Sequence, residues 1–399
     1  MTKNNTKKAV AQAISTAVAL GWVIMQVESA QAATLTVNNL NDSGVGSLRD
    51  TINIANNNDV LEFLLESHPS TISLTSGPLA IAKNLTINGP GANLLTISSN
   101  NHFPVFDINA ADVTFSGLAI AGSFNAYNSS NLTFTNSTVS SDNFKIDSNL
   151  RLINSTINSN NIEINAGDVT LTDNSQLVSS NDIKINANNV TLTDHSQLVS
   201  RNDSGAAGSI TVTASEAITI TGSDVLPTKV PEPSAIAAGS NHSGLGGNIT
   251  INSGALILRP GATISKPVPK PSALAKLAVG IAAGSNHSGA GGNITLKIPD
   301  LLILKPVRKP SAMADDRNNS GLGGNISINS SFIIAPPNEP SEIAGDSNNS
   351  GAGGTLTVTA SSISLTKVPE PSAIAGSILA GSLAWLAKRK QGAFRKAKI

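Results

Sequence analysis

The sequence predicts an all-β chain whose body is a right-handed parallel β-helix. Three observations carry this prediction. Charged residues make up only 13% of the 399 residues and aromatic residues 3%, whereas Asn, Ser, Thr, Gly and branched aliphatic residues are abundant. Such a mixture suits short strands joined by tight polar turns. A short strand pattern also recurs about every 20 residues, and apolar and polar residues alternate within it, which is the period of a half-buried strand.

The recurring pattern is a polar residue followed by an apolar-polar-apolar triplet. Its copies start at offsets of 19, 18, 19 and 21 residues: Asp112–Phe115, Asn131–Phe134, Asn149–Leu152, Asp168–Leu171 and Asn189–Leu192. Second short strands lie between the copies, at Phe144–Ile146, Ile162–Ile164 and Ile183–Ile185, each followed by Asn or Asp. This period fits one coil of a β-helix, whose coils stack about 4.8 Å apart. The spaced leucines of a leucine-rich repeat are absent.

Residues 33–120 are expected to form the capped start of the helix. The Gly-containing turns of Leu40–Asp50 precede Thr51–Ala55, where a short amphipathic helix would cover the exposed first coil. Strands are expected at Ile72–Leu74, Asn84–Asn88 and Leu95–Ile97. Over residues 36–120 this region resembles the N-terminal part of bacterial secreted right-handed β-helix proteins.

Residues 121–225 are predicted to form regular coils and residues 226–366 coils with Pro-, Ser- and Gly-rich loops. In the second region Gly-Gly-Asn recurs at Gly246–Asn248, Gly291–Asn293 and Gly323–Asn325, and Gly353–Thr355 ends the series. Each copy precedes a strand. These coils resemble the repeats of filamentous-haemagglutinin-type exoproteins. The intervening Pro/Ser/Ala segments are expected to protrude as loops.

Residues 1–32 read as a secretory signal peptide with a signal helix. Lys3, Lys7 and Lys8 precede an apolar stretch over residues 9–27. Ala30-Gln31-Ala32 then fits the small-x-small rule for cleavage, which predicts that signal peptidase cuts before Ala33. The alternative is a membrane anchor, which the polar breaks within the stretch and the cleavage motif disfavour.

Residues 367–399 are predicted to be a second targeting segment, with a C-terminal hydrophobic helix. Residues 1–32 and residues 367–399 are together called the terminal addresses. Val368-Pro369-Glu370-Pro371 is followed by an apolar run over residues 373–387 and by the basic cluster Lys388-Arg389-Lys390, which is a stop-transfer signal. The three parts in this order resemble the PEP-CTERM sorting signal. The resemblance implies cleavage near the Pro-Glu-Pro motif by an exosortase-type membrane peptidase. A simple C-terminal anchor is the alternative.

The nine residues Lys229–Ala237 are identical to Lys367–Ala375. Only the second copy precedes an apolar run that can cross a membrane, since polar residues follow the first. We therefore interpret Lys229–Ala237 as a segmental duplication in an exposed loop between coils.

Several classes of function are disfavoured. The absence of cysteine excludes disulfides, thiol catalysis and Cys-based metal sites. The chain has 26 basic and 26 acidic residues, of which nine basic and one acidic lie in residues 1–32 and 388–399, so the body between carries a net charge of −8. This argues against nucleic acid as a partner. We expect no cofactor and no metal.

Many parallel β-helices cleave polysaccharides, which requires clustered carboxylates or a basic proton acceptor. The best candidates are Arg151 and four aspartates that could align on stacked coils: Asp168, Asp173, Asp182 and Asp194. All four aspartates sit at repeated turn positions, and we interpret them as turn residues. A solvated strand residue is the preferred interpretation of Arg151.

The five histidines lack metal-ligand spacing: His68, His102, His195, His242 and His287. Both tryptophans, Trp22 and Trp385, lie in the terminal addresses and Tyr127 is the single tyrosine, so the body offers few platforms for sugar binding. Basic residues concentrate between Arg259 and Lys309. A patch that binds an anionic glycan or lipid is the alternative to the interpretation that we prefer, a solvated loop face.

We therefore expect a non-enzymatic, structural or adhesin-like protein. It would be exported to the cell envelope, the cell surface or the extracellular space and anchored transiently in the membrane. An extracellular polysaccharide is a candidate ligand. The alternative is a polysaccharide lyase or glycosidase of the β-helix class, which three carboxylates within about 6 Å of one another beside Arg151 would favour.

Overall fold

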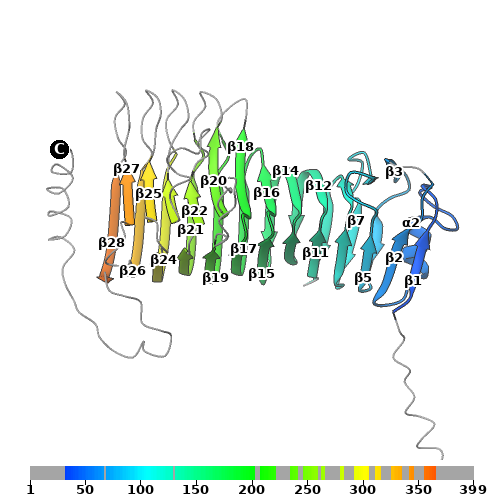
Figure 1. The fold of residues 1–399 in the computed structure, drawn as a ribbon, viewed down its shortest axis with the longest axis horizontal. Helices are drawn as coiled ribbons and strands as arrows, with labels where there is room; N and C mark the ends of the chain where they lie inside the picture. The colour runs from blue at the N-terminus through cyan, green and yellow to red at the C-terminus, as the bar shows by residue number, and fades with distance from the viewer. Residues whose placement is uncertain are drawn as a thin grey trace, which may run out of the picture.

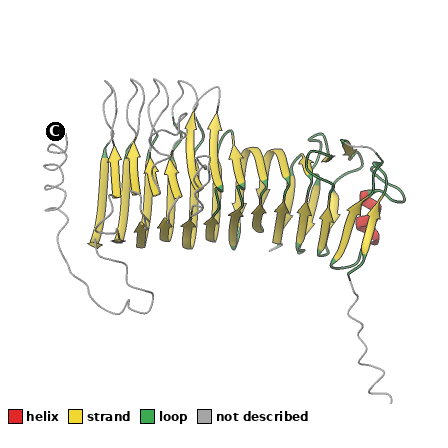
Figure 2. Cartoon of the chain, viewed as in Figure 1, coloured by secondary structure: helices red, strands yellow, loops and turns green. Residues whose placement is uncertain are grey.

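The computed structural model is an elongated stack of parallel strands with one helix at its N-terminal end (Figures 1 and 2). It describes residues 32–66, 69–128, 131–202, 207–221, 234–240, 246–258, 262–265, 279–282, 292–304, 311–315, 325–334, 341–345 and 355–364. The fold is a parallel β-solenoid, because each strand pairs in parallel with strands one coil before and one coil after it. The expected helices of both terminal addresses lie outside the described residues.

The strands form three stacks. Within the described ranges, the first stack contains thirteen strands: β1 (Thr34–Val37), β2 (Asp59–Phe63), β5 (Leu85–Asn88), β8 (Val113–Ser116), β11 (Asn131–Thr135), β13 (Asn149–Ile153), β15 (Asp168–Thr172), β17 (Ile183–Leu192), β19 (Ile210–Ile220), β21 (Ile249–Leu258), β24 (Ile294–Leu304), β26 (Ile326–Ile334) and β28 (Leu356–Ser364).

The second stack consists of β3 (Ser70–Ser73), β6 (Leu95–Ser98), β9 (Ala119–Ala121), β12 (Thr138–Ile146), β14 (Thr156–Asn165), β16 (Gln176–Ser179), β18 (Gln197–Asn202), β20 (Ser234–Ser240), β22 (Ala262–Ser265), β23 (Val279–Ala282), β25 (Ser311–Asp315) and β27 (Ser341–Gly345).

The third stack begins with β4 (Leu79–Ile81), β7 (Phe106–Asn109) and β10 (Phe124–Tyr127). It continues through the second halves of β12 and β14 and then through the first halves of the long strands from β17 onward. These long strands therefore turn a corner of the coil and contribute to two faces.

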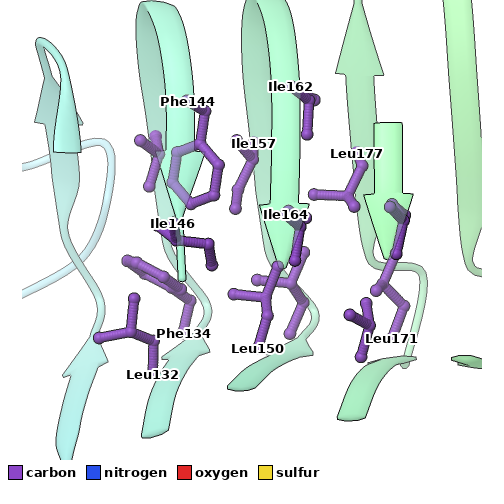
Figure 3. Packing of buried hydrophobic residues seen from close by; sticks show 14 of the residues in the cluster. Leu132, Phe134, Phe144, Ile146, Leu150, Ile157, Ile162, Ile164, Leu171 and Leu177 are labelled. Atoms are coloured by element: carbon purple, nitrogen blue, oxygen red, sulfur yellow. The ribbon is translucent and has the colours of Figure 1, made fainter. Parts of the chain in front are cut away.

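The core lies inside the coils and is built by equivalent residues of successive turns. Because successive side chains of a strand point to opposite faces, every second residue points into the coil, as the labelled apolar residues of Figure 3 do. Five phenylalanines form a continuous stack with ring centroids 4.7–6.0 Å apart: Phe106, Phe115, Phe124, Phe134 and Phe144. All five are buried. The core of each coil is thus completed by its two neighbours.

The helix α2 (Leu48–Ile54) covers the first coil, which confirms the expected N-terminal cap. Leu48 and Ile52 are buried in the core. The helix starts earlier than expected, because the Ser47 hydroxyl accepts a hydrogen bond from the backbone N–H of Asp50 and thereby caps its N-terminus.

The strands expected after each Gly-Gly-Asn motif are confirmed, and they stack in register from β21 to β28. The expectation that Lys229–Ala237 lies wholly in a loop is wrong. Ser234–Ala237 begins β20, with Ile236 buried against Leu198 of the preceding coil. The reason is the alternation in Ser-Ala-Ile-Ala, which places the one large apolar side chain inward. The Ser-Ala-Met and Ser-Glu-Ile segments of β25 and β27 are likewise strands.

Candidate functional site

The polar residue that opens each copy of the main repeat belongs to a hydrogen-bonded ladder, here called the asparagine corner. Its members lie just before or at the start of first-stack strands, except that the last lies at the corner within β17: Asn84, Asp112, Asn131, Asn149, Asp168 and Asn189. Asn149 Nδ2 donates to Asn131 Oδ1 (2.7 Å), and Asn149 Oδ1 accepts from the backbone N–H of Asp168 (2.9 Å). Each side chain thus links its own coil to the next one, so the repeat is explained by coil stacking.

A second ladder is buried at another corner, here called the serine corner: Ser137, Ser155, Ser175, Ser196 and Ser234. Every member is at most 2% exposed. Ser155 Oγ accepts from the backbone N–H of Ser137 (3.0 Å) and donates to the carbonyl of Ile153 (2.9 Å). The residues before the first four of these serines adopt positive φ, as at Asn136 (49°) and Asn154 (47°). Asparagine tolerates this conformation better than most residues.

The serine corner was not predicted. A signal was present in the sequence, because Asn-Ser recurs at 136–137, 154–155 and 174–175 and becomes His195-Ser196 in the next coil. Composition-based reasoning assigns such pairs to exposed turns. The turn asparagine is indeed at the surface, whereas the serine after it points inward.

The Gly-Gly-Asn motifs form a third corner. Asn248 Oδ1 accepts from the backbone N–H of Asn293 (2.9 Å), and Asn293 Oδ1 from that of Asn325 (3.2 Å). The glycine is required for close approach, since a Cβ atom at Gly247 would lie 1.9 Å from the carbonyl oxygen of Gly208. Asp182 begins this column, where its Oδ1 accepts from the backbone N–H of Ser209 (2.8 Å).

The four candidate aspartates occupy three different corners. Asp168 is in the asparagine corner and Asp182 in the Gly-Gly-Asn corner. Asp173 and Asp194 lie on adjacent coils with φ of 55° and 52°, at the turns before the serine corner. Each therefore has a turn or stacking role, as the sequence indicated. In the part of the chain that the structure describes, no three His, Asp or Glu residues gather as a metal site would require.

Arg151 lies on the outer face of β13, in register with Thr133 of β11 and Thr170 of β15. The column continues through further threonines in both directions: Thr86, Thr114, Thr191 and Thr219. The position is exposed, in agreement with a solvated strand arginine. Its immediate partners in the neighbouring coils are hydroxyl side chains.

Other candidates are dispersed. His102 is exposed in the turn after β6, and the backbone N–H of His195 donates to Ser234 Oγ (3.0 Å). His68, His242 and His287 lie outside the described residues. Tyr127 ends β10 on its outer face, where the negative charge of Asp107 raises the pKa of its hydroxyl. Lys145 and Glu163 form an exposed ion pair (3.2 Å) on adjacent coils.

The N-terminal cap contains a dense polar cluster around Asp42 that sequence reasoning missed. Asp42 pairs with Arg49 (2.7 Å) and accepts hydrogen bonds from the backbone N–H groups of Thr75 (3.1 Å) and Ser76 (2.8 Å). Burial opposes ionisation of Asp42. The hydrogen bonds from Ser76, Arg49 and Thr75 outweigh this and hold the pKa of Asp42 far below its usual value. The cluster ties the loop before α2 to the second coil.

Most residues of the two addresses fall outside the described residues, namely Ala30, the motif Val368-Pro369-Glu370-Pro371 and the cluster Lys388-Arg389-Lys390. Ala32 and Ala33 are described and exposed just before β1. The described residues contain no helix of the length and apolarity needed to cross a bilayer.

Comparison with known proteins gives no relative. No family model matches the chain, and neither a curated protein nor a solved structure is similar to it.

Proposed function

We propose that this chain is an exported structural, adhesin-like protein of the cell surface or extracellular space, built as a right-handed β-helix. The observation that carries the proposal is that its repeated polar residues form hydrogen bonds between coils. The asparagine, serine and Gly-Gly-Asn corners bind one coil to the next over most of the stack. Side chains that are repeated from coil to coil in this way make a rod stiff. The outer faces of the coils then carry threonine, asparagine and charged residues.

Right-handed winding is the finer part of the fold proposal. Strands that follow each other in parallel within one sheet are connected by right-handed crossovers in nearly all proteins, because strands themselves twist to the right.

The two terminal segments would direct the export and the sorting of the chain. Signal peptidase would cut before Ala33, and an exosortase-type peptidase would act at Pro369-Glu370-Pro371 while the apolar run holds the chain in the membrane. The duplicated motif sharpens this proposal. Since Ser234–Ala237 belongs to a core strand, this part of the shared sequence is compatible with a coil, which supports the view that the motif is not sufficient as a signal. The apolar run and the basic cluster must provide the specificity.

The test is localisation of a tagged chain in the producing cells, together with the mass of its C-terminus. Replacing Pro369, Glu370 and Pro371 by alanine should abolish C-terminal processing and retain the chain in the membrane. The matched control replaces Pro231, Glu232 and Pro233 by alanine and should leave processing unchanged. Equal loss from both variants, or recovery of the wild-type chain from the cytoplasm, would contradict the proposal.

A further inference from the structure

Asp59 is the first residue of β2 and lies next to Ala33, the residue before β1. The residue is only 2% exposed. Its Oδ1 accepts from the backbone N–H of Ala33 and its Oδ2 from that of Asn56, both at 2.7 Å. The Ala33 carbonyl in turn accepts from the backbone N–H of Val60 (2.8 Å). Both the N–H and the carbonyl group of Ala33 are therefore hydrogen-bonded to the next coil, although the residue is exposed.

Ala33 is also the residue that cleavage after Ala32 would leave first. Hydrolysis of that bond uses one water: the Ala32 carbonyl carbon gains a hydroxyl group and the Ala33 nitrogen gains a hydrogen. The resulting α-amino group has an ordinary pKa of about 7.7–8.0, so at neutral pH it takes up a proton and becomes an ammonium ion. A neutral peptide N–H facing a carboxylate is thereby replaced by a cation.

From this juxtaposition we propose that Asp59 is the binding site for the α-ammonium group of the mature chain. The inference rests on the cleavage position given in the proposed function. A carboxylate with little exposure is stabilised further by a partner of opposite charge, because a charge-assisted hydrogen bond between two ions is stronger than one from a neutral donor. The Ala33 nitrogen already lies within hydrogen-bond distance.

The nearby cation Lys83 is engaged elsewhere. Its Nζ donates to the carbonyls of Ile52 (3.0 Å), Asn53 (2.9 Å) and Ala55 (2.5 Å) at the C-terminal end of α2. Lys83 contributes to the lowered pKa of Asp59, but the hydrogen bonds from Ala33 and Asn56 are the larger causes. The α-ammonium would thus be the cation in direct contact with this carboxylate.

The pair would secure β1. Among the described strands, β1 pairs only with β2 and so forms the edge of the first stack. An edge strand frays and can recruit other chains unless it is fixed or covered. Processing would therefore complete the N-terminal cap by fixing the strand beside α2.

The experiment compares two chains that both run to Ile399 in detergent, one starting at Ala33 and one at Ala32. Both carry an α-ammonium group, but only in the first is it located at Asp59. Hydrogen exchange of residues 33–40 should be several-fold slower in the Ala33 chain at pH 7. The Asp59→Asn variant should remove the difference. N-acetylation of the Ala33 chain, which keeps the carboxylate, should make its exchange as fast as that of the Ala32 chain.

Equal exchange in the two wild-type starts, or a difference that persists in Asp59→Asn, would overturn the pair. The pairing raises the pKa of the α-amino group and requires an ionised Asp59, so the protection should be complete from about pH 4 to about pH 8 and lost as pH rises through the raised value. N-terminal sequencing of the chain from producing cells tests the cleavage separately. A first residue other than Ala33 would overturn the cleavage and the biological use of the pair. An Ala33 start without the exchange difference would overturn only the pair.

Discussion

Replacing Ser155 by alanine tests the serine corner. The substitution removes a hydroxyl that accepts from the Ser137 backbone N–H (3.0 Å) and donates to the Ile153 carbonyl (2.9 Å). Ser137 and Ser155 are both 2% exposed, so water cannot replace the lost acceptor. An unsatisfied buried N–H costs about 1–3 kcal/mol, and we expect a loss of about 2 kcal/mol in the free energy of unfolding.

The assay is urea unfolding followed by circular dichroism, with hydrogen exchange of the Ser137 amide as a local measure. Ser140→Ala is the matched control, because Ser140 is exposed on the outer face of β12. The control should change stability by less than about 0.5 kcal/mol. Equal effects of the two substitutions, or unchanged protection of the Ser137 amide in Ser155→Ala, would refute the account of this corner.

Three further predictions concern the core, the cap and the outer face. Phe124→Ala should destabilise the protein by about 3–5 kcal/mol in urea unfolding, because four other phenylalanine rings surround that position; Phe124→Leu should cost much less. Asp42→Asn should lower stability by about 1–2 kcal/mol at pH 7. Since the folded pKa of Asp42 lies below 3.8, the wild-type advantage should be complete above that pH and shrink as pH falls further; an advantage independent of pH would contradict it. Purified protein should not turn over acidic polysaccharide, and activity that disappears in Arg151→Ala or Asp173→Ala would support the alternative function.

The coil repeat could be predicted because it is written directly into residue spacing. The offset of 18 residues between Asn131 and Asn149 is the register in which β11 and β13 pair. The same holds for Gly-Gly-Asn, where the offset of 45 residues between Asn248 and Asn293 returns as the pairing of β21 and β24. In a β-solenoid, the period of the sequence repeat directly gives the register in which strands of successive coils pair.

The corners and the cap could not be predicted in the same way. Whether Ser155 points inward depends on the backbone turn made by Asn154, and alternation along a strand does not extend through such a turn. Asp42 binds the backbone of Ser76, 34 residues away, and Asp59 binds that of Ala33 across a first coil of 26 residues, which is longer than the period of the sequence repeat. The loop prediction for Ser234–Ala237 rested on the surrounding Pro/Ser/Ala composition and on the polar residues that follow, whereas Ile236 and the alanines on either side of it are buried and continue the stack.

The most direct test of the account measures how distance grows with coil number. The chain has no cysteine, so spin labels can be attached to cysteines introduced at outer-face positions. Thr86 is four coil steps from Thr170, five from Thr191 and six from Thr219. At 4.8 Å per step, electron paramagnetic resonance should give distances near ~19, ~24 and ~29 Å for the three pairs. Distances that do not rise by about one coil spacing from each pair to the next would contradict the parallel solenoid.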